Sequence, residues 1–347
     1  MKPVFIIADN ILSPLGLTTS ENFGLLKDDV SGIREHHVPE IAPHAFYASV
    51  FREEEDFSIV HNKDAYTKFE RLLIASMQQA LLETAIDVTQ SRTALIISST
   101  KGNISLIENG TIDAALVNRI SLPASAKLVA GYFHFSTAPI VVSHACISGI
   151  VALITGMRLL QSGTYDHAVV AGADIITQFI LSGFESFHAV SDAPCKPFDA
   201  ARNGITLGEA AATIILSTQK PDGKDCIQLL GGAISNDANH ISGPSRTGEE
   251  LSLAIEAAIQ EAGIDKMSID FISAHGTATV YNDDMESKAI SLSGLQKIPV
   301  NSLKGYFGHT LGAAGLIETA ACVQSLKENV ILPTHGFREP GTTFRFG

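Results

Sequence analysis

Residues 140–163 read IVVSHACISGIVALITGMRLLQSG, and they join a short apolar strand, a tight turn and a helix made almost entirely of small and apolar residues. A second stretch of the same design spans residues 298–329, IPVNSLKGYFGHTLGAAGLIETAACVQSLKEN. A helix that is apolar on all sides is buried in the middle of a protein. Because the chain contains two such helices, we expect them to pack against each other at its centre.

The segments around these helices indicate an approximate internal duplication. Each half opens with an apolar strand, continues with an amphipathic helix that has apolar residues at i, i+3, i+4 and i+7, and then adds another buried strand. The paired segments are residues 4–8 and 227–232, 69–85 and 251–263, and 93–98 (TALIIS) and 269–274 (IDFISA). Strands that alternate with helices predict parallel sheets covered on both faces.

The predicted fold class is therefore α/β, a five-layer α/β/α/β/α arrangement with pseudo-twofold duplicated halves. Residues 1–220 form the N-terminal half, which carries Cys146, and residues 221–347 form the C-terminal half. The halves meet at a polar stretch with Pro and Gly, residues 219–225. Since the two apolar helices pack together, we expect one interlocked unit.

Composition excludes several classes of protein. The net charge of −13 and a pI of about 5.3 disfavour general binding to nucleic acid or to an anionic membrane. Lys63, Lys68 and Arg71 could form a local basic patch for an acidic partner, or simply a solvated helix face. The sequence shows neither a signal peptide nor an apolar run long enough to span a bilayer, which predicts a cytoplasmic protein. Four cysteines without a C-x-x-C pair disfavour a disulfide scaffold or a zinc ribbon.

Cys146 lies at the turn before the first apolar helix. A helix N-terminus favours negative charge, so we expect it to lower the pKa of this thiol. The backbone N–H of Cys146 would point toward a carbonyl oxygen bound there. These features predict a nucleophile, although a small buried cysteine is the alternative.

His275 directly follows the IDFISA strand, where it suits a positioned proton donor or acceptor. A histidine bonded into its own loop and a metal ligand are the alternatives. A metal is weakly supported, because no second histidine lies at helical spacing and Asp283-Asp284 resembles a helix cap.

The third site is Lys304 to His309, followed by Gly312-Ala313-Ala314-Gly315. It contains no G-x-G-x-x-G and no Gly-Lys-Ser/Thr, which excludes dinucleotide and P-loop binding. A lysine after an apolar strand is costly unless it is paired or functional. By the pseudo-symmetry, Cys146 and His309 occupy matching positions, and His275 ends a neighbouring strand. The chain also has no G-x-S-x-G, so a serine hydrolase elbow has no support.

Four ordered motifs carry a resemblance that runs nearly end to end: VSHACISG (142–149), PFDAARNGITLGEAAA (197–212), AHGTATVYNDDMESKAI (274–290) and SLKGYFGHTLGAAG (302–315). With these motifs the chain resembles the β-ketoacyl-acyl-carrier-protein synthases, Cys-His-His condensing enzymes of the thiolase superfamily. Thiolases have a second cysteine in this set, and chalcone-synthase-like enzymes have an asparagine.

The resemblance implies an acyltransferase that catalyses a decarboxylative Claisen condensation. An acyl group on Cys146 would react with malonyl-acyl-carrier protein and give β-ketoacyl-acyl-carrier protein, in fatty-acid or polyketide type synthesis. His275 and His309 would hold the thioester carbonyl and stabilise the enolate. No metal or redox cofactor is implied, because phosphopantetheine arrives on the carrier-protein substrate. The implied assembly is a homodimer with its interface beside the nucleophile half, or a heterodimer with a related ketosynthase subunit.

The same resemblance assigns supporting roles. Lys304 would tune the charge state of the histidines and pair with Glu286, and Asp283 would support the site. Thr277 and Thr279 match positions that hydrogen-bond the pantetheine arm.

Two departures from the family pattern affect the expected function. The sequence lacks the usual C-terminal Gly-Phe-Gly-Gly turn of the family, which supplies a second oxyanion N–H and a gating Phe. Residues 344–347 (FRFG) resemble that turn only weakly. Either the chain is incomplete or it lacks half its oxyanion hole, a loss that typically costs about a hundredfold in rate. Residues 110–123 are also compressed, which would alter the acyl pocket. The alternative functions are a non-catalytic or half-catalytic chain-length-determining partner subunit, and a plain acyltransferase or a polyketide or polyene synthase.

Overall fold

The computed structural model describes residues 2–52, 60–108, 112–221, 226–238 and 243–345. Its largest sheet has the strand order β5-β4-β6-β8-β1-β9. Strand β4 pairs in parallel with β5 and β6, while β8 is antiparallel to β6 and to β1. The sheet is therefore mixed, which corrects the prediction of a parallel sheet. The strands are β1 (Phe5–Leu12), β4 (Thr93–Ser98), β5 (Ile140–Val142), β6 (His167–Asp174), β8 (Ala210–Ser217) and β9 (Ile227–Gln228).

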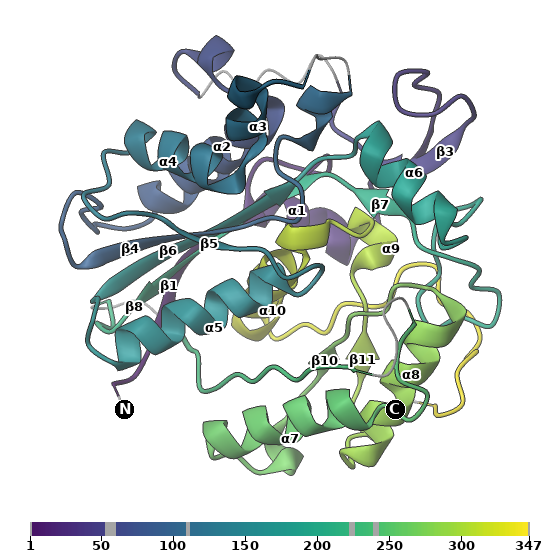
Figure 1. Cartoon of the computed structure of the whole chain (residues 1–347). Helices are drawn as coiled ribbons and strands as arrows, with labels where there is room; N and C mark the ends of the chain where they lie inside the picture. Colours follow the sequence, from purple (N-terminus) through teal and green to yellow (C-terminus); the bar gives the residue numbers. More distant parts are fainter. Residues whose placement is uncertain (1, 53–59, 109–111, 222–225, 239–242, 346–347) are drawn as a thin grey trace.

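Both faces of this sheet are buried. Alternate residues of β4 point to opposite sides, so Leu95 and Ile97 join one apolar cluster and Ala94 and Ile96 join another. Helix α2 (Lys68–Leu82) covers the first face, and α5 (Ser148–Gln161) and α10 (Ala314–Glu328) cover the second (Figure 1). The sheet is therefore an inner layer of the molecule.

The two apolar helices meet at the centre, as predicted from the sequence. A side chain on Gly149 of α5 would lie 3.0 Å from the backbone nitrogen of Leu316 on α10. A side chain on Gly315 would in turn lie 2.5 Å from Ile150. Glycine at these positions therefore lets the two backbones approach closely. The contact confirms the predicted central layer, and with it the thiolase-like α/β class.

The second half has a smaller sheet in the described part of the chain. Strand β10 (Ile272–Ser273) pairs in parallel with β11 (Val300–Asn301). Helices α7 (Glu249–Ala262) and α8 (Val280–Leu292) pack beside these strands (Figure 1). A short helix α9 (Lys304–Phe307) and a 3-10 turn η4 (Leu311–Ala313) lead from β11 into α10.

The remaining elements surround these layers. A three-stranded sheet has the order β2-β3-β7. The elements not yet given are α1 (Thr19–Lys27), β2 (Arg34–His36), β3 (Phe46–Ser49), η1 (Lys63–Ala65), η2 (Ile104–Ile107), α3 (Ala114–Ile120), α4 (Leu122–Tyr132), α6 (Gln178–Ser186), β7 (Leu207–Gly208) and η3 (Lys266–Ser268). Within the described ranges no helix is both long and apolar enough to cross a bilayer.

Two predicted strands are shorter than expected. The expected strand 227–232 is β9, which has two residues and extends the large sheet by pairing with β1. The expected strand 269–274 is reduced to β10, because a 3-10 turn precedes it. The division at residue 220 stays a prediction, and residues 222–225 of the expected junction lie outside the described residues. The same holds for residues 110–111 and 346–347 of the two departures noted above.

Candidate active site

Cys146 lies in the turn between β5 and α5, two residues before the helix begins. Ala145 has a left-handed backbone conformation with φ +48°. The Ser148 hydroxyl donates to the Ala145 carbonyl at 2.6 Å and accepts the His144 N–H at 2.8 Å. These bonds hold the turn that presents the thiol.

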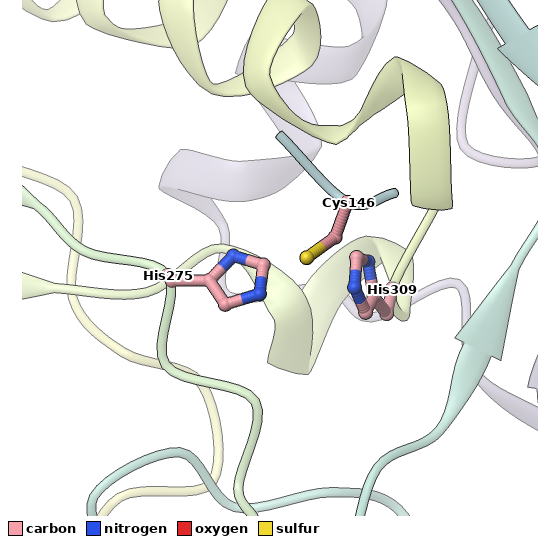
Figure 2. Close-up of side chains that lie close together, drawn as sticks. All are labelled: Cys146, His275 and His309. Carbon is pink, nitrogen blue, oxygen red and sulfur yellow. The ribbon is translucent and has the colours of Figure 1, made fainter. Parts of the chain in front are cut away.

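The structure brings Cys146, His275 and His309 together from three separate segments, as predicted (Figure 2). The Cys146 sulfur and a ring nitrogen of each histidine all lie within 4.8 Å of one another. The two imidazole rings are edge to face, with centroids 5.1 Å apart and an interplanar angle of 86°. A small acyl or carboxyl group between them would therefore contact all three side chains.

The position of the proton on the His309 ring is set by a hydrogen bond from the backbone of Leu311. His309 lies between α9 and η4, and the Leu311 N–H donates to its Nδ1 at 3.2 Å. Burial lowers the pKa of His309 well below its usual value, with further lowering by Lys304 and His275. The ring is therefore neutral near pH 7, and because Nδ1 accepts, Nε2 carries the proton.

His275 is positioned by α8. Glu286 on that helix accepts the backbone N–H groups of His275 and Gly276, each at 2.7 Å. Asp283, one helical turn earlier, accepts those of Ala278 at 3.1 Å and Phe198 at 2.7 Å. Their two carboxylates thus hold the backbone around the loop after β10.

The same burial shifts the ionisation of this loop. Burial raises the pKa of Glu286 to about 7 and that of Asp283 to about 6, against the backbone N–H groups that lower both. Burial also lowers the pKa of His275 well below its usual value, and the charge of Lys304 adds to the effect. His275 is therefore neutral near pH 7, like His309.

Lys304 pairs with Glu318 of α10, which corrects the predicted pair with Glu286. Lys304 Nζ lies 2.7 Å from Glu318 Oε1, and the lysine side chain is only 2% exposed. Glu286 instead binds the loop after β10, where its two oxygens accept the backbone N–H groups of His275 and Gly276, and Glu318 lies on the helix that follows the Lys304 turn. The sequence did contain a signal for Glu318, because a lone acidic residue within a buried apolar helix requires a partner.

The expectation of a lowered thiol pKa is also wrong for the free protein. Burial raises the pKa of Cys146, and this effect exceeds the opposing effects of the Lys304 charge and the backbone N–H of Cys146. Removing a thiolate from water costs more free energy than the positive end of the helix regains, so the pKa of the thiol rises.

Three residues with a strained, left-handed backbone lie close in sequence to the site side chains. Ala145, Ala278 and Leu311 all have positive φ, at 48°, 63° and 52°. Each lies within three residues of Cys146, His275 or His309. A left-handed non-glycine residue costs about 1–2 kcal/mol, so the surrounding bonds must hold these turns in place.

The other predicted site residues are placed as follows. The Thr277 and Thr279 hydroxyls lie 3.0 Å apart at the start of α8, and their contact with pantetheine stays a prediction.

In the basic patch predicted from the sequence, Lys68 Nζ lies 2.6 Å from the buried carboxylate of Glu209, so its charge is paired within the protein. Cys146, His275 and His309 also form a ligand set that Zn²⁺ accepts.

Comparison with known proteins gives the family of this chain. The family model for the N-terminal domain of β-ketoacyl synthases matches residues 1–221, and the C-terminal domain model matches residues 227–338. The chain is 29% identical to 3-oxoacyl-[acyl-carrier-protein] synthase 2 of Vibrio harveyi over 98% of its own length and 89% of that protein. It is 34% identical to a putative polyketide β-ketoacyl synthase 1 of Streptomyces halstedii over 57% of its length and 50% of that protein.

Solved structures agree. The ishigamide ketosynthase/chain length factor superposes with a TM-score of 0.88 at 25% identity, over 98% of this chain and 89% of that one. A ketosynthase in complex with its chain length factor from Xenorhabdus doucetiae superposes with a TM-score of 0.80 at 28% identity, over 97% and 90%. The chain therefore belongs to the β-ketoacyl synthase family. It is an acyltransferase of the condensing, β-ketoacyl-acyl-carrier-protein synthase type.

Proposed function

We propose that the protein condenses an acyl group held on Cys146 with malonyl-acyl-carrier protein, with loss of CO2, to give a β-ketoacyl-acyl-carrier protein. The observation that carries this proposal is the convergence of one thiol and two neutral imidazoles within 4.8 Å. A nucleophile is needed for the acyl group, and two hydrogen-bond donors are needed for the enolate.

The first half-reaction is acyl transfer. The Cys146 thiol loses its proton and attacks the thioester carbonyl of an acyl group on the carrier protein's phosphopantetheine. The new carbon–sulfur bond forms as the bond to pantetheine breaks, and the departing thiolate takes up the proton. The backbone N–H of Cys146 is the oxyanion donor in this step. The Lys304 charge assists, because it opposes the effect of burial on the thiol pKa.

The second half-reaction is decarboxylation and carbon–carbon bond formation. The malonyl thioester oxygen accepts hydrogen bonds from His309 Nε2–H and from the His275 ring. The bond to the carboxylate breaks, CO2 leaves, and the electron pair passes to the enolate that these donors stabilise. The enolate carbon then attacks the acyl carbonyl on Cys146, and the Cys146 thiolate departs. Neutral imidazoles suit this step because they donate a hydrogen bond without protonating the carbanion.

The proposal includes a carrier-protein partner and a dimer in the cytoplasm. The phosphopantetheine arm arrives on the substrate, Thr277 and Thr279 hydrogen-bond it, and no metal or redox cofactor is used. Strand β5 lies at the end of the large sheet, and the exposed residues 143–145 follow it. An open sheet edge beside the nucleophile turn is a natural place for a second subunit. We propose a homodimer, with a heterodimer with a related subunit as the alternative.

A chain-length-determining role in a heterodimer is the second candidate function. It is favoured by the similarity to ketosynthases solved together with chain length factors. The intact set of Cys146, His275, Lys304 and His309 favours the catalytic role instead, because a subunit that only shapes a tunnel has no need of a nucleophile.

Intact-protein mass spectrometry after incubation with an acyl-carrier protein bearing an acyl thioester separates the two roles. We expect the mass of one acyl group on the protein, and peptide mapping should place it on Cys146. Cys146→Ala should abolish the adduct. Cys195→Ala is the control, because Cys195 is a second free thiol, but it is buried and its Sγ–H donates to the Lys304 carbonyl at 3.2 Å. This variant should acylate normally.

Two results would contradict the catalytic proposal. One is a wild-type protein that never acquires an acyl group. The other is an adduct that persists in Cys146→Ala. A stoichiometric zinc ion that is measured in the purified wild-type protein and lost in Cys146→Ala would instead indicate that the same three side chains form a metal site.

A further inference from the structure

The carboxylate of Asp174, the last residue of β6, binds backbone groups from both halves of the molecule. Asp174 is only 1% exposed. Its Oδ1 accepts the Ser99 hydroxyl at 2.7 Å and the Lys101 N–H at 3.3 Å. Its Oδ2 accepts the N–H groups of Thr100 at 2.9 Å and Gly312 at 2.7 Å. Hydrogen bonds to a charged acceptor are about twice as strong as neutral ones, so this carboxylate ties the end of β4 to the turn after His309.

Gly312 is held at both its polar atoms. The Ser98 hydroxyl donates to the Gly312 carbonyl at 3.0 Å, while Asp174 accepts the Gly312 N–H. A side chain on Gly312 would lie 2.7 Å from the Ser99 Cα and 2.8 Å from Asp174 Oδ2, so only glycine fits. The same carbonyl lies 3.1 Å from the position of a side chain on Gly149, at the start of the Cys146 helix. Gly312 is thus fixed between the strand ends and that helix.

The residue before Gly312 contacts the catalytic histidine. Leu311 has φ +52°, and its N–H donates to His309 Nδ1 at 3.2 Å. A leucine in this left-handed conformation costs about 1–2 kcal/mol and persists only while neighbouring bonds hold it. The bonds at Gly312 are the adjacent ones. If they were lost, Leu311 could relax to negative φ and turn its N–H away from His309.

We propose that Asp174, assisted by Ser98, is a positioning residue for His309: by fixing Gly312, it keeps the Leu311 N–H on Nδ1 and so keeps the proton of His309 on Nε2. Asp174 does not touch the reacting atoms and acts only through this turn. The consequence for catalysis rests on the function proposed above, in which His309 Nε2–H donates to the malonyl thioester oxygen. The consequence for the tautomer does not depend on that function.

The first test is the His309 tautomer. ¹⁵N-histidine-labelled protein reports which ring nitrogen carries the proton, and His309→Ala assigns the signal. We expect a single Nε2–H form in the wild type and a mixture of the two tautomers in Asp174→Asn, because its amide cannot accept all the bonds of the carboxylate. An Asp174→Asn spectrum identical to that of the wild type would overturn the inference.

The second test separates the two half-reactions. Release of CO2 from malonyl-acyl-carrier protein should fall about 10- to 100-fold in Asp174→Asn, the scale of a misplaced catalytic group. Acylation of Cys146 should change little, because it does not use His309. A general loss of structure would reduce both half-reactions together, and a split between them is the signature of positioning.

A matched pair of serine variants keeps the inference testable if Asp174→Asn does not fold. Ser98→Ala removes the bond to Gly312. Ser76→Ala also removes a fully buried hydroxyl, but that hydroxyl lies 2.9 Å from Thr213 Oγ1 between α2 and β8. We expect a mixed His309 tautomer and slower decarboxylation in Ser98→Ala alone. Equal behaviour of the two variants would overturn the role of the turn. A wild-type protein that fails both half-reactions defeats the proposed function, and the tautomer measurement then decides the positioning role.

Discussion

Lys304 Nζ lies 2.7 Å from Glu318 Oε1, and this one ammonium group acts on all three side chains of the site. Its charge partly offsets the raising effect of burial on the pKa of the Cys146 thiol, and it adds to the lowering effect of burial on the pKa of both imidazoles. For the thiol the effect favours the charged form, and for the imidazoles it favours the neutral form. A single buried cation therefore promotes the nucleophile and the two hydrogen-bond donors at the same time.

The Lys304–Glu318 ion pair predicts that substitutions of its two residues have strongly non-additive effects on the free energy of unfolding. Lys304→Met leaves a buried carboxylate without its cation, and Glu318→Leu leaves a buried ammonium group without its anion. Each should cost about 3–5 kcal/mol, whereas the double variant should lie near the wild type. Urea denaturation of the four proteins in a double-mutant cycle measures this. Additive losses would show that the two side chains are stabilised independently.

The charge of Lys304 also predicts how the reactivity of Cys146 depends on pH. Alkylation of Cys146 by iodoacetamide, followed on its own peptide, should rise with pH and give a pKa above the ordinary value of about 8.5. In Lys304→Met/Glu318→Leu the profile should move to higher pH, because Lys304 affects this thiol more than Glu318 does. An unchanged or lower pKa in that variant would show that the ammonium group does not act on the thiol.

Periodicity predicted the elements whose burial is decided locally. Strand β4 coincides with the predicted residues 93–98, and the two apolar helices lie at the centre as expected. The extents of β9 and β10 could not be predicted, because a strand ends where its neighbour stops pairing. That depends on segments far away in the sequence, whereas helical bonds are local.

The candidate site shows the same limit. The pseudo-symmetry of the halves was enough to bring Cys146 and His309 together. The partner of Lys304 was assigned wrongly, because the reach of a buried ammonium group depends on how α9 turns into α10. The direction of the thiol pKa was also wrong, since a motif indicates the helix start but does not give the depth of burial that opposes it.

The raised pKa of Glu286 predicts that the protein loses stability as pH rises. Burial raises the pKa of its carboxyl from an ordinary 4.5 to about 7, so between these values the folded protein holds a proton that the unfolded chain has released. Stability must therefore fall as pH rises through this window, by about 3 kcal/mol from this group. Glu286→Gln removes the titration.

Denaturation of the wild type and Glu286→Gln at about pH 5 and about pH 8 checks this prediction. The advantage of the wild type over the variant should shrink toward the higher pH. Asp283→Asn should remove a smaller part of the pH dependence, because the pKa of Asp283 rises only to about 6. A wild type that gains stability relative to Glu286→Gln as pH rises would reverse the sign and contradict the raised pKa.

The two half-reactions should separate in His309→Ala. This variant loses the Nε2–H that donates to the malonyl thioester oxygen, so CO2 release should fall by about a hundredfold or more. Acylation of Cys146 should continue, because the Lys304 charge that assists the thiol remains in place. Burial lowers the pKa of both imidazoles well below the usual value of about 6.5, so both rings stay neutral in mildly acidic solution. CO2 release by the wild type should therefore persist as pH falls below about 6.5. Radiolabelled acyl and malonyl carrier proteins measure the two steps separately. Loss of acylation with CO2 release intact would mean that His309 acts on the thiol and not on the malonyl group.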